Sequence, residues 1–421
     1  MTGVGAASRE VENSPRVDLV DSSEPVENVV GVASFRTLAV LLWAASVIPS
    51  AVLLLSGSGR VWNETIAYTP ATQALRNVLV YAVLGWSVII ILRHGTQLLR
   101  RPFGTIALVA LALFYPALSG YFHEDGSADE LFIAFVSLVV VLAVFSLRLH
   151  TRVLSIVGGL GALTGAVSLL MAWRRPETAF VVEGGGRVLA GPFDNSNYLG
   201  TVLILSLPFA LLIRRKIVRF ASILLIAAPI LMGGSTTSIV TLGVFALIGV
   251  LMFLFRAPLS RARILGVAGG IALLATMILP HVVNDAGAFT SRGAIWALAN
   301  QKMMDFIPFG AGEEWFEANS RSTGFSINHA HNMLLHPLIV GGLPYLGAVL
   351  ALIILLLVFG VRLTARGGSI APAAYAVMLI VAGAVGSFFI LDARDLRYLA
   401  TGFVVVTLLS IATARRTSNA D

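Results

Sequence analysis

The chain has 421 residues, of which 57% are hydrophobic and 12% are charged. A water-soluble protein cannot hide this much apolar surface, so the composition excludes an ordinary soluble domain and indicates a polytopic membrane protein. The net charge of +7 is typical of basic loops that orient a membrane protein, rather than of a nucleic-acid-binding surface. The absence of cysteine excludes disulfides, thiolate metal sites and a cysteine nucleophile.

Residues 1–35 differ from the rest of the chain, because they are polar and acidic and show no helical periodicity. This composition predicts a disordered tail. It does not predict a secretory signal, because no short basic region leads directly into an apolar segment.

Twelve apolar segments follow, and each approaches the length of about 20 residues that crosses a bilayer as a helix. We therefore predict an all-α polytopic membrane protein, with about twelve transmembrane helices in residues 36–414 and a short tail over 415–421. The segments are 37–56, 77–92, 104–121, 130–147, 153–173, 198–213, 218–233, 237–255, 264–280, 333–360, 370–391 and 397–413.

The connectors between these segments alternate in character. One set is short and basic, and the other is longer and carries the acidic residues. The positive-inside rule places the short set in the cytoplasm, and an even number of helices then places both termini there, in a multi-pass protein of the inner (plasma) membrane. The longest connector, 281–332, is thus predicted to be an extracytoplasmic loop containing short interfacial helices.

The stretch RVLAGPFDNSNYLG, residues 187–200, is rich in turn-forming residues and leads into an apolar segment. Asn197 or Ser196 is suited to cap that helix. Arg187 is suited to bind a phosphate with its guanidinium group, but an arginine that snorkels to the membrane interface fits equally well.

Residues 289–316 predict an amphipathic interfacial helix that Ser291 caps and that Pro308 ends. Arg292 falls in the expected first turn, where the helix dipole disfavours a cation. A bound anion would resolve this conflict, because it would contact both the arginine and the free backbone N–H groups.

The stretch SINHAHNMLLHPLIVGG, residues 326–342, places His329, His331, Asn332 and His336 at the start of an apolar run. A zinc site is disfavoured, because no third ligand lies nearby and the His-Glu-x-x-His pattern is absent. A single histidine is usually a hydrogen-bonded structural residue. At an outer helix end, beside candidate anion-binding arginines, a neutral imidazole is also suited to act as a general base.

Three groups of residues occur in the order found in a known family. They are Arg187, Gly191, Phe193 and Asn197; Ser291, Arg292, Trp296, Pro308, Gly310 and Gly312; and His331, Asn332 and Gly342. Together with the helix count and the large loop before the histidines, they resemble the O-antigen ligase and O-antigen polymerase superfamily. The segment GLPYLG after Gly341 lacks the threonine pair often seen in ligases, so the resemblance leaves ligase and polymerase open.

The resemblance implies a metal-independent, inverting glycosyltransferase without a cofactor. Its donor would be a glycan linked to polyprenyl diphosphate, and its acceptor would be a hydroxyl group of a glycan or a lipid. Membrane lipids would surround the enzyme. Arg187 and Arg292 would then hold the diphosphate, His331 would activate the acceptor, and Asn332 would orient it. His329, Asn197 and His336 would support the site.

Two other classes of function remain open for this sequence. The first is a transporter or flippase of a lipid-linked or amphipathic anion. The predicted helix centres of this chain have almost no ionisable groups, and this disfavours a proton-coupled transporter. The second is a scaffolding membrane protein. Between the last two helices, a local ion-pair cluster is predicted, and a supporting role at the site is the less favoured alternative for its members. They are Asp392, Arg394, Asp395 and Arg397.

Overall fold

A computed structural model of the chain describes residues 30–58, 60, 66–122, 128–183, 185–283, 285–323, 329–386 and 397–417. Helices dominate these residues, and a two-stranded antiparallel hairpin is the one sheet among them. The prediction of an all-α membrane protein is confirmed at this level.

Each of the twelve predicted apolar segments coincides with an apolar helix. Seven of these helices are long and apolar enough to cross a membrane, and five are shorter. Their bounds are α1 Val30–Leu55, α2 Pro70–His94, α3 Phe103–Phe122, α4 Ala128–Phe145, α5 Ser155–Arg174, α7 Ser196–Ala210, α8 Lys216–Gly233, α9 Thr236–Leu254, α10 Pro258–Val282, α13 Leu335–Ala365, α14 Ala371–Gly383 and α15 Gly402–Thr417.

Shorter elements lie between the long helices. The helices α6 and α11–α12 and the two strands belong to the connectors that were predicted to be long. The bounds are α6 Pro176–Ala179, β1 Phe180–Glu183, β2 Gly186–Leu189, α11 Ala288–Gln301 and α12 Glu314–Thr323, with 3₁₀ turns η2 Gly95–Arg100, η3 Thr151–Leu154, η4 Met303–Phe306 and η5 Tyr398–Ala400.

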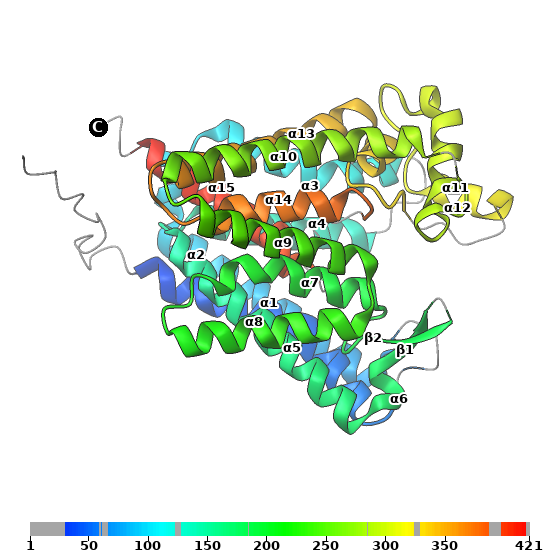
Figure 1. Cartoon of the computed structure of the whole chain (residues 1–421), viewed down its shortest axis with the longest axis horizontal. Coiled ribbons are helices and arrows are strands. Elements are labelled where there is room, and N and C mark those ends of the chain that lie inside the picture. The colour runs from blue at the N-terminus through cyan, green and yellow to red at the C-terminus, as the bar shows by residue number, and fades with distance from the viewer. Residues whose placement is uncertain are drawn as a thin grey trace, which may run out of the picture.

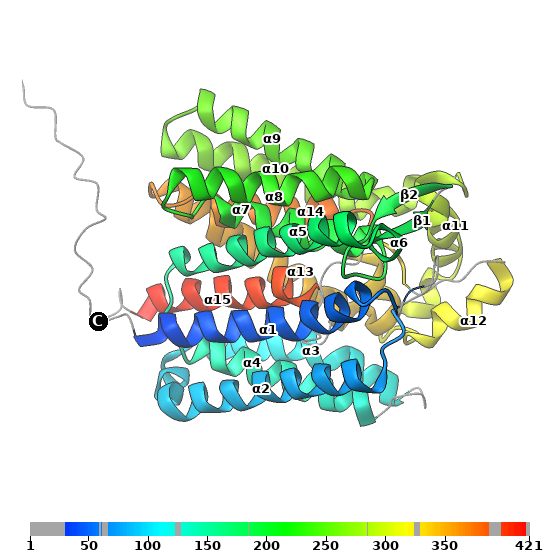
Figure 2. The same cartoon turned by 90° about the horizontal axis from the view of Figure 1, so that it is seen from below.

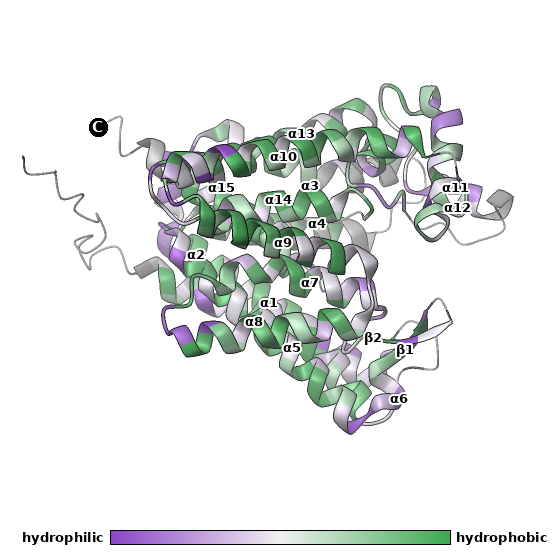
Figure 3. Cartoon of the chain, in the orientation of Figure 1, coloured by the Kyte–Doolittle hydropathy of each residue, from purple (hydrophilic) through white to green (hydrophobic). Residues whose placement is uncertain are grey.

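The long helices form one bundle with two different ends (Figures 1 and 2). One end carries α11, α12 and the hairpin, and we call it the site end. The first residue of α1 and the last residues of α15 lie at the other end, which we call the terminal end. Apolar residues fill the helices between these ends, and polar residues gather at both (Figure 3).

The first helix begins earlier than the sequence predicted. It starts at Val30, inside the segment predicted as a tail, and residues 1–29 lie outside the described part. Phe35 is fully buried and its ring stacks on Phe403 of α15 at 5.1 Å. Packing against α15 therefore extends the helix beyond the apolar run.

The centre of the bundle is built on the close approach of α5, α7 and α8. A Cβ atom on Gly158 would lie 2.4 Å from the backbone nitrogen of Ala210, and one on Gly165 would lie 1.9 Å from the carbonyl oxygen of Leu225. Small residues permit such contacts between membrane helices. The glycine-rich sequence of α5 therefore lets α7 sit at the core with nearly all of its residues buried.

Helices α8, α9 and α10 form an apolar flank of the bundle. Large apolar side chains are exposed along them, including Phe220, Leu247 and Ile271, whose exposed fractions are 64%, 57% and 64%. Such side chains are stable on the surface of a membrane protein because lipid covers them.

Candidate functional site

The loop that contains His329 and His331 lies at the site end, just before α13. The indole Nε1 of Trp296, on α11, donates a 2.8 Å hydrogen bond to the carbonyl oxygen of Ala330. Trp296 is fully buried. The tryptophan therefore fixes the loop between the two histidines to α11.

Asn332 uses both ends of its side chain to hold the same loop in place. Its Oδ1 accepts hydrogen bonds from the backbone N–H groups of Leu334 and Leu335, at 3.0 and 2.9 Å. Its Nδ2 donates to the carbonyl oxygens of Thr276 and Ala384, at 2.9 and 3.0 Å. The side chain is fully buried. These contacts give Asn332 a positioning role, rather than the predicted role of orienting an acceptor.

A kink in α13 receives the loop that follows η4. Gly342 has φ of 63° and interrupts the helix. The N–H of Leu343 donates to the carbonyl oxygen of Pro308 at 2.9 Å, and the N–H of Ala311 donates to that of Ile339 at 2.7 Å. A Cβ atom on Gly342 would lie 2.1 Å from the same Pro308 oxygen, so only glycine fits. Pro308 and Gly342, which are two of the residues behind the family resemblance, thus contact each other where the loop packs into the kink of α13.

Three histidines lie together beside this kink. The imidazole rings of His329 and His331 have their centroids 3.7 Å apart, and the ring of His336 lies 6.5 Å from that of His329. His336 stacks on Phe316 of α12 at 5.3 Å. Within the described ranges, no group of three or more His, Asp or Glu side chains is placed to hold a metal ion.

The backbone at His331 is in the left-handed region, with φ of 50°. A residue with a side chain adopts this conformation at a cost, and it persists only where the surroundings enforce it. Here the bonds of Trp296 and Asn332 fix the residues on either side. The backbone N–H of His331 donates to Nδ1 of His329 at 3.2 Å, so this nitrogen carries no proton.

The histidines are held in their neutral form. Burial, and then the charges of Arg292 and His336, lowers the pKa of His331 to about 3. Burial, followed by the charges of His331, His336, Arg397 and Arg292, lowers the pKa of His329 to about 2. Burial also lowers the pKa of Arg292 itself. Two arginines from distant parts of the chain therefore act on one imidazole pair.

The second of these arginines, Arg397, was predicted to belong to a local ion-pair cluster. Its guanidinium carbon lies 3.9 Å from the ring centroid of Tyr198, near the start of α7. Such stacking is a favourable cation–π contact. Asp392, Arg394 and Asp395, the other members of that cluster, lie outside the described residues. Arg397 thus links the start of α7 to the histidines.

The sequence analysis gave Arg397 a supporting role at the site only as the less favoured alternative, although a stronger signal was present. Arg397 is the first residue of the last predicted apolar segment, 397–413. By the alternation of the connectors, this segment starts on the same face as the histidines. That placement could have added Arg397 to the candidate cations.

The predicted diphosphate ligand Arg187 lies elsewhere at the site end. It sits exposed on β2, where it pairs with Val182 of β1. Its Nη2 donates to the carbonyl oxygen of Pro176 at 3.3 Å, and its guanidinium carbon lies 5.8 Å from the ring centroid of Phe180. The hairpin and α11 occupy opposite sides of the site end (Figure 1). The structure therefore does not bring Arg187 beside Arg292 as the sequence analysis expected.

The helix cap predicted at Ser196 or Asn197 is Asn195 instead. Its Oδ1 accepts a 3.0 Å hydrogen bond from the N–H of Tyr198. Oδ1 of Asn197 accepts a 2.7 Å bond from the hydroxyl of Ser235, which precedes α9. Glu183 of β1 accepts bonds from the N–H and hydroxyl of Ser196. Asn197 therefore joins two helix starts.

The interfacial helix also begins at a different residue. The helix α11 starts at Ala288 after Gly287, so Ser291 lies inside it and is not its cap. Phe289 has a φ of 52°, which is not helical, so the regular turns of α11 begin after it and Arg292 lies in the first of them. The expectation that an anion binds at this position stays a prediction.

Compared with known proteins, the chain matches no family model, and no curated protein is similar to it in sequence. The geometry of its own residues therefore carries the functional conclusion.

Proposed function

We propose that the chain is a membrane glycosyltransferase of the O-antigen ligase and polymerase type. It would transfer a saccharide from a polyprenyl-diphosphate donor to an acceptor hydroxyl at the site end, which faces away from the cytoplasm. The observation that carries the proposal is the placement of His331, which is neutral, held in a strained backbone conformation, and close enough to Arg292 for its pKa to respond.

The arginines are suited to the leaving group of this reaction. A diphosphate departs with negative charge, and arginine stabilises phosphate oxygens with paired, charge-assisted hydrogen bonds. Arg292 approaches from α11, and Arg397 approaches from the segment before α15. In this proposal Arg397 replaces Arg187 as the second cation, because Arg397 acts on the histidines.

His331 would act as the general base. The acceptor oxygen attacks the anomeric carbon, its proton passes to an imidazole nitrogen of His331, and the bond from that carbon to the diphosphate oxygen breaks. The products are the new glycosidic bond and polyprenyl diphosphate. Attack opposite the leaving group inverts the anomeric configuration, and no step requires a metal.

Donor binding would also make His331 a stronger base. In the free protein, the charge of Arg292 adds to burial in lowering the pKa of His331. A bound diphosphate offsets that charge and so raises the pKa of the imidazole again. The imidazole is thus more basic when the donor is in place than in the free protein.

The test is turnover by protein reconstituted in nanodiscs, with a polyprenyl-diphosphate-linked oligosaccharide as donor and either a second copy or a separate lipid-linked sugar as acceptor. The variant His331→Asn tolerates a positive φ, so its loop keeps its conformation. We expect it to bind donor while turnover falls about 10²- to 10⁴-fold.

The matched control is His281→Asn, which changes an exposed histidine at the end of α10. Normal turnover by His331→Asn would refute the assignment of the base. If the wild-type protein moves the lipid across the membrane and transfers no sugar, the transporter alternative replaces the proposal. Transfer of the saccharide to a second donor molecule would indicate a polymerase, and transfer to the separate lipid-linked sugar would indicate a ligase.

A further inference from the structure

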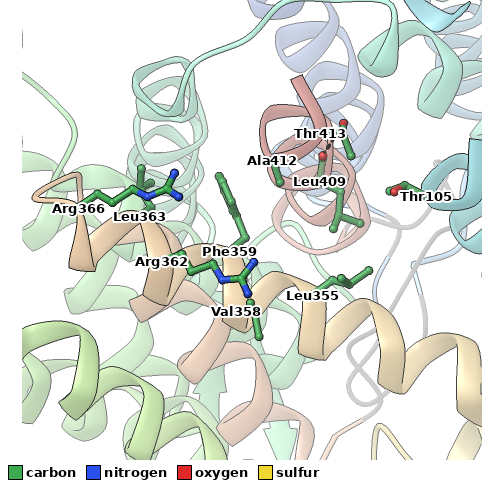
Figure 4. A pocket seen from close by; sticks show the side chains of 10 residues that line it. All are labelled: Thr105, Leu355, Val358, Phe359, Arg362, Leu363, Arg366, Leu409, Ala412 and Thr413. Atoms are coloured by element: carbon green, nitrogen blue, oxygen red, sulfur yellow. Dashed lines mark hydrogen bonds between the residues drawn. The ribbon is translucent and has the colours of Figure 1, made fainter. Parts of the chain in front are cut away.

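A second polar feature lies at the terminal end of the bundle, far along α13 from the histidines. A cavity of about 170 Å³ opens there between α3, α13 and α15. Figure 4 shows the side chains of Arg362 and Arg366 on one side of it, and Thr413 with Leu409 on the other. This cavity has no part in the chemistry proposed above.

The two arginines at the cavity are four residues apart, with Arg362 in the last turn of α13 and Arg366 at its C-cap, so they lie on the same face of the helix end. No carboxylate within the described part of the chain forms an ion pair with either of them. The helix dipole favours cations at a C-terminus and accounts for their position, but it leaves their hydrogen-bonding groups available.

The part of the cavity wall that continues along α13 toward the middle of the bundle is apolar. Leu355 and Val358 lie one to two turns before Arg362 on α13, and each is 37% exposed. Phe359 lies between them and the arginines. The cavity therefore changes from cationic at its outer edge to apolar at its inner edge, in the direction in which a lipid changes from head group to acyl chain.

A third arginine, Arg101, contributes positive charge beside the cavity wall that α15 forms. Arg101 is buried, and its guanidinium group donates to the carbonyl oxygen of Ser410 at 2.7 Å and to Oγ1 of Thr413 at 3.5 Å. It also binds the carbonyl oxygens of Phe145 and Leu147, at 3.0 and 2.6 Å. Arg101 is thus held by neutral acceptors, and its charge adds to that of the two arginines across the cavity.

We propose that this cavity binds one anionic glycerophospholipid from the adjacent leaflet, with its phosphate between Arg362 and Arg366 and an acyl chain along Leu355, Val358 and Phe359. Free phosphate matches the cations but not the apolar wall, and a zwitterionic lipid brings its own cation to the arginines. The proposal depends on the membrane-spanning character of α13 and is independent of sugar transfer.

The test is native mass spectrometry of the purified protein given equal amounts of phosphatidylglycerol and phosphatidylcholine. We expect the wild type to retain one phosphatidylglycerol with a preference of about thirtyfold, because each basic residue near a membrane surface contributes to anionic-lipid binding. Arg362→Gln with Arg366→Gln removes this preference.

Two further variants keep the test decisive. Arg214→Gln with Arg215→Gln removes two exposed cations from the connector between α7 and α8 and leaves the preference unchanged. Ala412→Phe fills the cavity, keeps every arginine, and abolishes the preference. Gel filtration checks that each variant is folded.

Several results would overturn the proposal. Equal retention of phosphatidylglycerol by the Arg362/Arg366 variant would show that these cations do not hold it. Equal loss in the Arg214/Arg215 control would show a general effect of charge. Displacement by excess inorganic phosphate would reduce the site to an anion site, and stronger retention of a polyprenyl phosphate would replace the glycerophospholipid.

Discussion

The histidine loop, together with α11 that holds it, and the β-hairpin lie at the same end of the bundle, and each of these two regions includes an arginine that the sequence marked for the donor diphosphate. In the histidine loop region, Arg292 is largely buried and acts on two imidazoles. On the hairpin, Arg187 is exposed and contacts its own hairpin and the preceding turn. Burial beside titratable groups, rather than residue type, distinguishes a candidate reaction site from a polar surface.

The hairpin has a different task, which its buried contacts show. Glu183 of the hairpin holds Ser196 at the start of α7. Next to it, Arg60 from the connector between α1 and α2 donates to the carbonyl oxygen of Phe193. Burial lowers the pKa of Arg60 to about 10, although Asp194 and Glu183 act against this shift. The hairpin thus fixes the start of α7, and through Tyr198 it supports Arg397.

The largest expected effect comes from removing the arginines of the two regions and comparing the losses of turnover. Replacing Arg292 and Arg397 together by glutamine should reduce turnover more than about 10³-fold, because in the proposed reaction each stabilises charge that develops on the leaving group. Arg187→Gln should reduce turnover less than about tenfold, because an exposed cation acts through water. Steady-state kinetics in nanodiscs measures both. A greater loss in Arg187→Gln would place the donor at the hairpin.

A smaller effect is expected from replacing the asparagine that holds each region, which is Asn332 in the histidine loop and Asn197 at the start of α7. Asn332→Ala removes four hydrogen bonds in a fully buried place and should destabilise the protein by about 2 kcal/mol or more. Asn197→Ala removes the bond from Ser235 and should cost about 1 kcal/mol. Thermal unfolding in detergent ranks the two. Equal shifts would show that the histidine loop is no more strongly held than the start of α7.

The smallest effect concerns the strained backbone at His331. His331→Gly relieves the positive φ and should stabilise the protein by about 1 kcal/mol while it abolishes turnover. The same thermal unfolding experiment, with the turnover assay, tests this trade of stability against activity. A destabilised glycine variant would show that the side chain of His331 contributes packing that outweighs the strain.

The sequence predicted the positions of the twelve apolar helices, because each is marked by an apolar run, and seven of these helices are long and apolar enough to cross a membrane. It also predicted that the histidine loop and Arg292 lie together, and the structure brings them close enough for Arg292 to act on the pKa of His331. It did not predict that α1 starts at Val30 or that α11 starts at Ala288, because helix ends depend on packing and on local backbone geometry.

The choice of the second cation was beyond the sequence for a different reason. Arg187 and Arg397 are equally cationic, and only the packing of α7 against the segment before α15 brings one of them to the histidines. Asn332 shows the same limit, because an amide can orient a substrate or hold a loop. Only its contacts with Thr276 and Ala384 decide between these roles.

The protonation of His331 in the protein without donor tests the central claim most directly. Nuclear magnetic resonance of protein with ¹⁵N-labelled histidine reports it, and His331→Asn assigns the signal. We expect the imidazole to stay neutral from pH 8 to about pH 4, since its pKa is about 3. Because the unfolded chain takes up this proton near pH 6.5, stability should fall as the pH falls below that value.

Arg292→Gln should raise this pKa, because it removes one of the two charges that lower it, while Arg187→Gln should leave it unchanged. A pKa near 6.5 in the wild type, unaffected by Arg292→Gln, would contradict the account, because His331 and Arg292 would then not share a buried site.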